Sequence, residues 1–86
     1  MKILFFVSNI GSYLHVEQII KIVLNENKEN NCYLLLSGSC KNEELNLPNL
    51  RVLRNEKFTR SELEEIISQN HFDNVFIGLT SYSKTQ

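Results

Sequence analysis

Three apolar runs without polar alternation constrain the fold of this 86-residue chain most strongly. They cover Ile3–Val7, Cys32–Leu36 and Val75–Ile77. A strand that is apolar at every position has both faces buried, which is typical of parallel strands covered on both sides. The runs are too short for a membrane span of ~20 residues, and Ile3–Val7 is shorter than the ~7–15 residues of a signal-peptide core. We therefore expect an α/β protein in the cytoplasm, with no transmembrane segment.

Two amphipathic segments lie between these runs. From Tyr13 to Asn25 the apolar residues recur at helical spacing, and Ser12 is the predicted N-cap. A second helix is predicted after Thr59, which forms a capping-box pattern with Glu62, and Ser61 with Glu64 offers a second possible cap. A short strand at Leu50–Leu53 completes the order strand, helix, strand, strand, helix, strand.

Strands separated by amphipathic helices predict right-handed crossovers and a parallel sheet covered on both faces. We expect strand two on one side of strand one and strand four on the other. The predicted fold is a Rossmann-like parallel sheet of about four strands, in the order 3-2-1-4, with two covering helices. Residues 1–86 are expected to form one such domain or the N-terminal part of a larger one, because no helix follows Val75–Ile77 to cover that strand. A further domain of the same protein, or self-association, is expected to supply the missing layer.

Composition excludes several functional classes. The formal net charge is −1, and the basic cluster of Arg51, Arg54 and Lys57 is too small for a nucleic-acid surface. Cys32 and Cys40 lack the spacing and the His partners of a zinc site, so we expect free thiols and no metal. Neither a dinucleotide-binding glycine fingerprint nor a P-loop occurs, and no cofactor is expected.

The candidate site lies beyond the carboxyl ends of the strands, beside strand one, where open α/β sheets bind ligands. Three loops rich in small hydroxylated residues and Gly are expected to converge there, although ordinary strand-to-helix turns favour similar residues. They are Ser8–His15, Ser37–Lys41 and Gly78–Thr85. Gly11, before a helix N-terminus, lets a ligand approach main-chain N–H groups. His15 is the candidate catalytic residue, because an imidazole can hydrogen-bond a sugar, a phosphate or an attacking hydroxyl. The candidate ligand-binding residues are Ser8, Asn9, Gly11, Ser12, Gly78, Ser81 and Tyr82.

Two parts of the chain resemble one enzyme family. The N-terminal stretch MKILFFVSNIGSYLHVEQIIKIV is similar to the start of GT-B glycosyltransferases, where a first strand leads into a Gly-containing loop with a His. The stretch FDNVFIG resembles a later strand of the same family. The short pieces SYLH and VFIGLTSYS are most similar to bacterial sialyltransferase- and polysialyltransferase-like enzymes of capsule or lipooligosaccharide synthesis.

This resemblance implies an N-terminal, acceptor-side domain. Gly11 and His15 would match the loop that lines the cleft, and Ser81 and Tyr82 would match the acceptor-side rim. The family binds its sugar nucleotide mostly in a C-terminal domain, so this chain alone is not expected to catalyse transfer. The partner expected from the resemblance is a sugar acceptor.

Two other classes stay open on the residues alone. One is a small stand-alone α/β module for ligand binding or regulation, and the other is the pre-ATP-binding domain of an ATP-grasp ligase, which has a similar strand–helix start. A receiver domain is disfavoured, because it needs an acidic cluster after strand one, where this sequence has Ser8 and Asn9. Each open class predicts a small-molecule ligand and no nucleic acid.

Overall fold

The computed structural model describes residues 1–77. Four strands and two helices follow one another along the chain in the order that the hydrophobic pattern predicts, with one additional 3-10 turn, η1. The elements are β1 (Lys2–Val7), α1 (Ile10–Glu26), β2 (Asn31–Leu36), η1 (Gly38–Cys40), β3 (Leu50–Arg54), α2 (Arg60–Asn70) and β4 (Asn74–Ile77). None of the helices in this part of the chain is long and apolar enough to cross a membrane.

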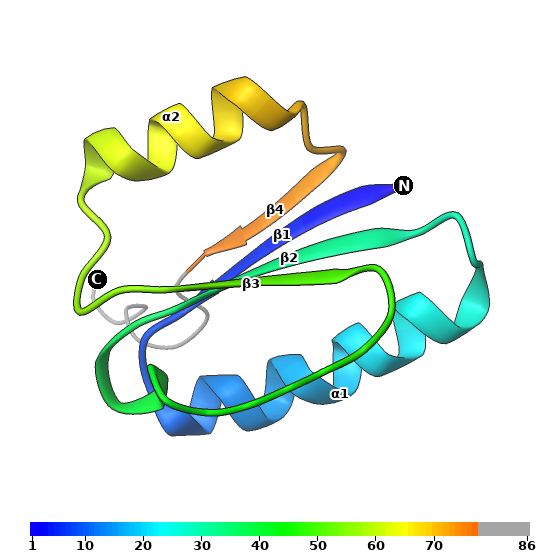
Figure 1. Ribbon diagram of the computed structural model, residues 1–86, viewed down its shortest axis with the longest axis horizontal. Helices are drawn as coiled ribbons and strands as arrows, with labels where there is room; N and C mark the ends of the chain where they lie inside the picture. The colour runs from blue at the N-terminus through cyan, green and yellow to red at the C-terminus, as the bar shows by residue number, and fades with distance from the viewer. Residues whose placement is uncertain (78–86) are drawn as a thin grey trace.

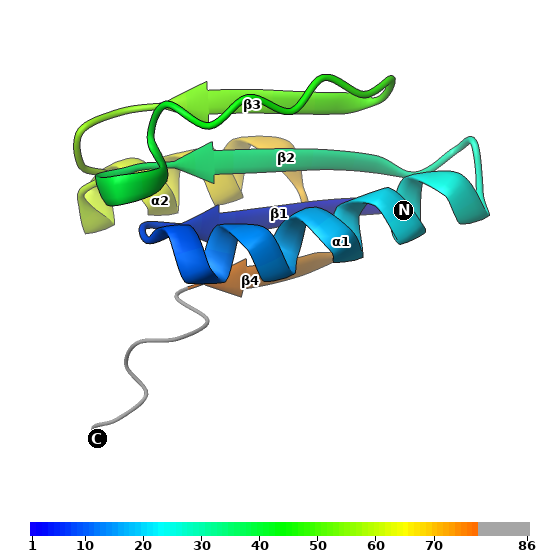
Figure 2. The same ribbon diagram turned by 90° about the horizontal axis from the view of Figure 1, so that it is seen from below.

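The four strands form one parallel sheet in the order β3-β2-β1-β4. Central strand β1 places Phe5 between Leu34 of β2 and Phe76 of β4. Helix α1 covers one face of the sheet and α2 lies on the opposite face (Figure 1, Figure 2). The predicted Rossmann-like α/β fold with order 3-2-1-4 is therefore confirmed.

The hydrophobic core lies between the sheet and α1. Side chains alternate between the two faces of a strand, so every second residue of β1 and β2 points at this helix. Val16 and Ile20 of α1 are fully buried against them. The strand residues of this core are Ile3, Phe5, Val7, Cys32, Leu34 and Leu36.

The connection from β2 to β3 contains no α-helix. It consists of η1 and an irregular loop, and it runs along the same face of the sheet as α1 (Figure 2). Leu45 of this loop is buried in the α1-side core. The Tyr13 hydroxyl of α1 donates to the Glu44 carbonyl oxygen at 3.5 Å. The loop therefore does the covering that a crossover helix does in larger sheets of this kind.

The α2 face is built from aromatic pairs. Phe6 of β1 meets Phe58 edge-on at 5.7 Å between ring centroids, and Tyr33 of β2 meets Phe72 edge-on at 5.0 Å. Helix α2 itself has no buried residue. Its N-terminus carries the predicted capping box, in which Thr59 is the N-cap. This face is therefore more open than the face under α1.

Edge strand β4 is apolar and exposed. Val75, Phe76 and Ile77 retain 36%, 42% and 46% of their accessible surface. Phe76 nevertheless stacks on Phe5 of β1, with ring centroids 5.2 Å apart and an interplanar angle of 11°. Within the described residues, β4 thus lacks the cover that its unbroken apolar pattern predicts for both faces.

Candidate functional site

The loops that follow β1 and β2 contact each other at the carboxyl edge of the sheet. The Ser39 N–H donates to the Ser8 carbonyl oxygen at 3.2 Å, and the Ser39 hydroxyl oxygen accepts from the Ile10 N–H at 3.0 Å. Gly38, with a left-handed φ of 58°, brings the second loop close to the first. Two of the three loops expected at this edge are therefore joined by hydrogen bonds.

The N-cap of α1 is Asn9, so the prediction that Ser12 caps this helix is wrong. Asn9 has extended dihedral angles, and its side-chain oxygen accepts from the Ser12 N–H at 2.8 Å. The apolar pattern misplaced the helix start because Ile10 is exposed and Gly11 carries no side chain. Ser12 lies inside the first turn and is buried.

The other predicted site residues of this loop fall into two groups, one at the start of α1 and one further along the helix. Ser8 is exposed directly after β1, Asn9 is half-buried, and Gly11 is exposed in the first turn of α1. His15 is exposed too, but the earlier helix start places it in the second turn. At 1.5 Å per residue it is about 9 Å along the axis from Asn9. The structure therefore groups Ser8, Asn9 and Gly11, with His15 further along the helix.

Three further candidate ligand-binding residues, Gly78, Ser81 and Tyr82, lie outside the described residues. They follow β4 in the sequence. The described half of the site is the one formed by the loops after β1 and β2.

Arg54 contributes a contact that sequence reasoning missed. Its guanidinium donates to the Lys41 carbonyl oxygen at 2.9 Å and also to the Glu43 carbonyl oxygen. The Lys41 ammonium in turn pairs with the Glu56 carboxylate. These contacts tie the end of β3 to the loop after β2, so Arg54 belongs to the scaffold of this edge. The sequence feature that could have indicated this role is the position of Arg54 at the end of β3, beside the loop that follows the neighbouring strand β2.

Cys40 is buried in the core next to this edge. It is fully buried, and its thiol donates to the carbonyl oxygens of Ser37 at 3.3 Å and of Val7 at 3.5 Å. Burial raises the pKa of the Cys40 thiol. A protonated thiol is a poor nucleophile, so Cys40 serves packing here. Within residues 1–77, no group of three or more His, Cys, Asp or Glu side chains could hold a metal ion.

At the junction of the loops after β1 and β2 the polar groups are neutral: the exposed hydroxyls of Ser8 and Ser39, the exposed main chain of Gly11 and the half-buried carboxamide of Asn9. The exposed charges of this edge belong to Arg54 and Glu56, at and after the end of β3. Hydroxyl and carboxamide groups both donate and accept hydrogen bonds, as the hydroxyl groups of a sugar do. Because Asn9 and Ser39 already accept from two N–H groups of the first turn of α1, the pull of this helix end on an anion is reduced. The arrangement is suited to a neutral polar ligand.

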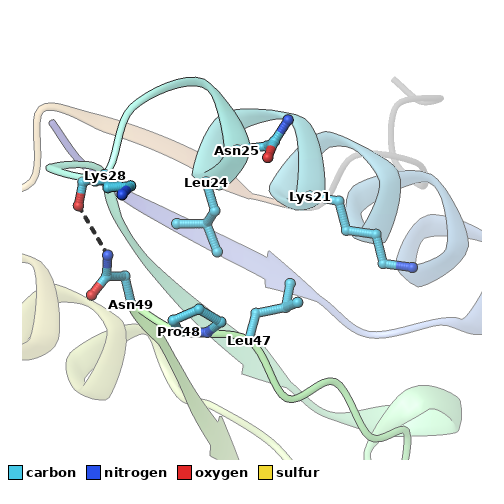
Figure 3. A pocket seen from close by; sticks show the side chains of 7 residues that line it. All are labelled: Lys21, Leu24, Asn25, Lys28, Leu47, Pro48 and Asn49. Atoms are coloured by element: carbon cyan, nitrogen blue, oxygen red, sulfur yellow. Dashed lines mark hydrogen bonds between the residues drawn. The ribbon is translucent and has the colours of Figure 1, made fainter.

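Two cavities lie at the opposite, amino edge of the sheet. The larger measures about 540 Å³ and lies between the C-terminal half of α1 and residues 47–49 (Figure 3). The smaller measures about 230 Å³ and is lined by residues 31–33 and 49–51. Neither includes a residue that the sequence placed in the site.

The sheet order and the placement of the helices define a Rossmann-like α/β protein whose candidate site lies at the carboxyl edge. Comparisons of the chain with protein-family models, with curated proteins and with solved structures found no match.

Proposed function

We propose that the carboxyl edge of the sheet binds a sugar acceptor, and that the chain is the N-terminal, acceptor-side part of a glycosyltransferase of surface polysaccharide synthesis. The observation that carries the proposal is the junction of the loops after β1 and β2. There Ser8 and Ser39 are exposed and hydrogen-bonded to each other through the main chain. The similarity of the N-terminal stretch to GT-B enzymes supports the same assignment.

His15 has a defined part in this proposal. It is exposed on the second turn of α1, whose N-terminus carries Asn9 at the candidate site. A neutral imidazole can accept the proton of an attacking acceptor hydroxyl when that group reaches it. The chain does not transfer sugar by itself in this proposal, because the nucleotide-bound donor is held by another domain.

The exposed apolar surface of β4 favours contact with a further layer of protein. Val75, Phe76 and Ile77 are exposed in a strand that has no charged residue. Such an edge strand favours association. We propose that a C-terminal domain of the same protein, or a second copy of this chain, covers it. Two free, buried cysteines are in keeping with a cytoplasmic location for the whole protein.

The acceptor assignment can be tested by nitrogen-15 NMR. Lactose, N-acetylneuraminic acid and CMP are titrated separately into the chain. We expect at least one of the two sugars to shift the amide signals of Ser8, Asn9, Gly11 and Ser39, and CMP to leave them unchanged. Binding of CMP at these residues, or no response to either sugar, would contradict the proposal.

Side-chain variants separate binding from folding. Ser8→Ala removes an exposed hydroxyl but keeps the carbonyl group that Ser39 contacts. We expect it to weaken sugar binding several-fold without changing the melting temperature. Ser61→Ala, an exposed serine on α2, is the matched control and should bind like the parent chain. In an intact enzyme, His15→Ala should lower turnover much more than stability, and Gln18→Ala on the same helix should change neither.

A further inference from the structure

We propose that the groove between the C-terminal half of α1 and residues 47–49 binds an anionic amphiphile, an apolar chain that ends in a single carboxylate. The groove measures about 540 Å³. That size falls within the ~300–1,000 Å³ of small-molecule sites. It lies at the amino edge of the sheet, so this inference is independent of the sugar site proposed at the carboxyl edge.

The groove has an apolar floor. Leu24 of α1 points across the groove toward Pro48, and Leu47 extends upward on the opposite side (Figure 3). Leu24 and Leu47 are half-buried and pack against the α1-side core. An acyl chain laid between them would bury apolar surface on both sides, at a gain of roughly 25 cal/mol per Å².

The charged residues at the rim are cationic. Lys21 and Lys28 line the groove, and none of its seven lining residues is acidic (Figure 3). The Lys21 ammonium already forms an ion pair with the Glu17 carboxylate of the same helix, at 3.5 Å. Lys28 forms no ion pair within residues 1–77. A ligand carboxylate can therefore pair with the Lys28 ammonium while its chain remains on the apolar floor.

Hydrogen bonds hold the walls in place. The Asn49 side chain donates to the Lys28 carbonyl oxygen at 3.0 Å, which ties the two sides of the groove together (Figure 3). The Cys32 N–H donates to the Asn49 carbonyl oxygen at 2.9 Å. Asn49 adopts a left-handed φ of 66°, a conformation that asparagine tolerates better than most residues. A groove formed in the free protein lowers the ordering cost of binding.

The test uses decanoate, kept below its micelle-forming concentration, and methyl and amide NMR of the intact chain. We expect shifts and ligand contacts at the methyl groups of Leu24 and Leu47, and no change in the amide signals of Ser8 or Asn9. Decylamine, with the same chain and a positive head, should bind several-fold more weakly. Equal binding of the two probes, contacts elsewhere on the protein, or no binding of decanoate would overturn the proposal.

Two matched pairs of variants test the charge directly. Asn25 is exposed on the rim, so Asn25→Glu adds a negative charge beside the groove without removing a buried side chain, and Asn25→Gln is its neutral control. Lys28→Glu reverses the proposed contact, and Lys57→Glu reverses an exposed lysine outside the groove. We expect both groove charge variants to weaken decanoate binding by about fivefold, as suits an exposed ion pair, and neither control to change it. Unchanged binding in Lys28→Glu would overturn the assignment.

Discussion

Gly38 approaches the Ser8 carbonyl group so closely that a methyl group at Gly38 would lie 2.2 Å from the Ser8 oxygen. Gly38 also has a φ of 58°, which costs residues with a side chain about 1–2 kcal/mol. We therefore expect Gly38→Ala to lower the free energy of unfolding by about 2 kcal/mol or more, since strain and steric overlap add. Urea unfolding followed by circular dichroism measures this change.

Gly11→Ala is the matched control for this substitution. A methyl group at Gly11 would meet only the Asn9 side-chain oxygen, at 3.4 Å, which is ordinary contact. Because alanine favours helices over glycine by about 0.5–1 kcal/mol, Gly11→Ala should leave stability unchanged or raise it. An equal loss of stability in both variants would refute the role given to the contact between Gly38 and Ser8.

The sheet order could be predicted because it depends on local patterns and a general rule of handedness. Unbroken apolar runs such as Ile3–Val7 mark strands buried on both faces. Right-handed crossovers, with helices on both faces of the sheet, are compatible with the order 3-2-1-4. The start of α1 could not be predicted in the same way, since Asn9 and Ser12 are both good N-caps. The structure shows Ser39 contacting the Ile10 N–H across 29 residues, a contact that local sequence does not encode.

The sequence placed the candidate site at the carboxyl edge of the sheet but did not predict the contacts within it. The expected meeting of the loops after β1 and β2 is observed, because parallel neighbouring strands end at the same edge of the sheet. Sequence reasoning gave no role to Gly38 or Arg54, because each acts on a segment distant in the chain. The groove lined by Leu24, Leu47 and Lys28 was also missed, since it combines a helix with an irregular loop.

The capping box of α2 should control how often this helix opens. The Thr59 hydroxyl oxygen accepts from the Glu62 N–H at 3.2 Å, and the Glu62 carboxylate accepts from the Thr59 N–H at 2.8 Å. Helix α2 has no buried residue, so packing contributes little to hold it. We expect Thr59→Ala to destabilise α2 by about 1 kcal/mol, seen as faster amide exchange throughout the helix. The nearby Ser61→Ala should leave exchange unchanged, and similar exchange in the two variants would contradict the prediction.

Stability should fall in alkaline solution because of Cys32. Burial raises the pKa of its thiol to about 11 from an ordinary value of 9.0. Between these two values the folded chain keeps a proton that the unfolded chain releases, so unfolding becomes more favourable as pH rises. The contribution of Cys32 is fully present below pH 9.0 and is lost toward pH 11. Its slope is at most about 1.4 kcal/mol per pH unit.

Cys32→Ala isolates this effect. The variant lacks the thiol and should lose stability less steeply between pH 9 and pH 11 than the parent chain, whatever its stability at pH 7. Cys40 and Tyr13, whose pKa values burial also raises, remain in both proteins and contribute equally. Parallel stability curves for the two proteins over this range would show that Cys32 does not titrate as described.

Lys2 should contribute to the free energy of unfolding, because its side chain connects α2 to the sheet. Its ammonium donates to the Asn70 carbonyl oxygen in the last turn of α2 at 2.8 Å. It also lies 5.3 Å from the ring centroid of Tyr33 and 5.5 Å from that of Phe72. Lys2→Met keeps the apolar stem but removes the charge, so we expect a loss of about 1–2 kcal/mol from the hydrogen bond and the cation–π contacts together. Lys57→Met, at an exposed lysine, should cost almost nothing. If Lys2→Met unfolds at the same urea concentration as Lys57→Met, the ammonium does not hold α2 to the sheet.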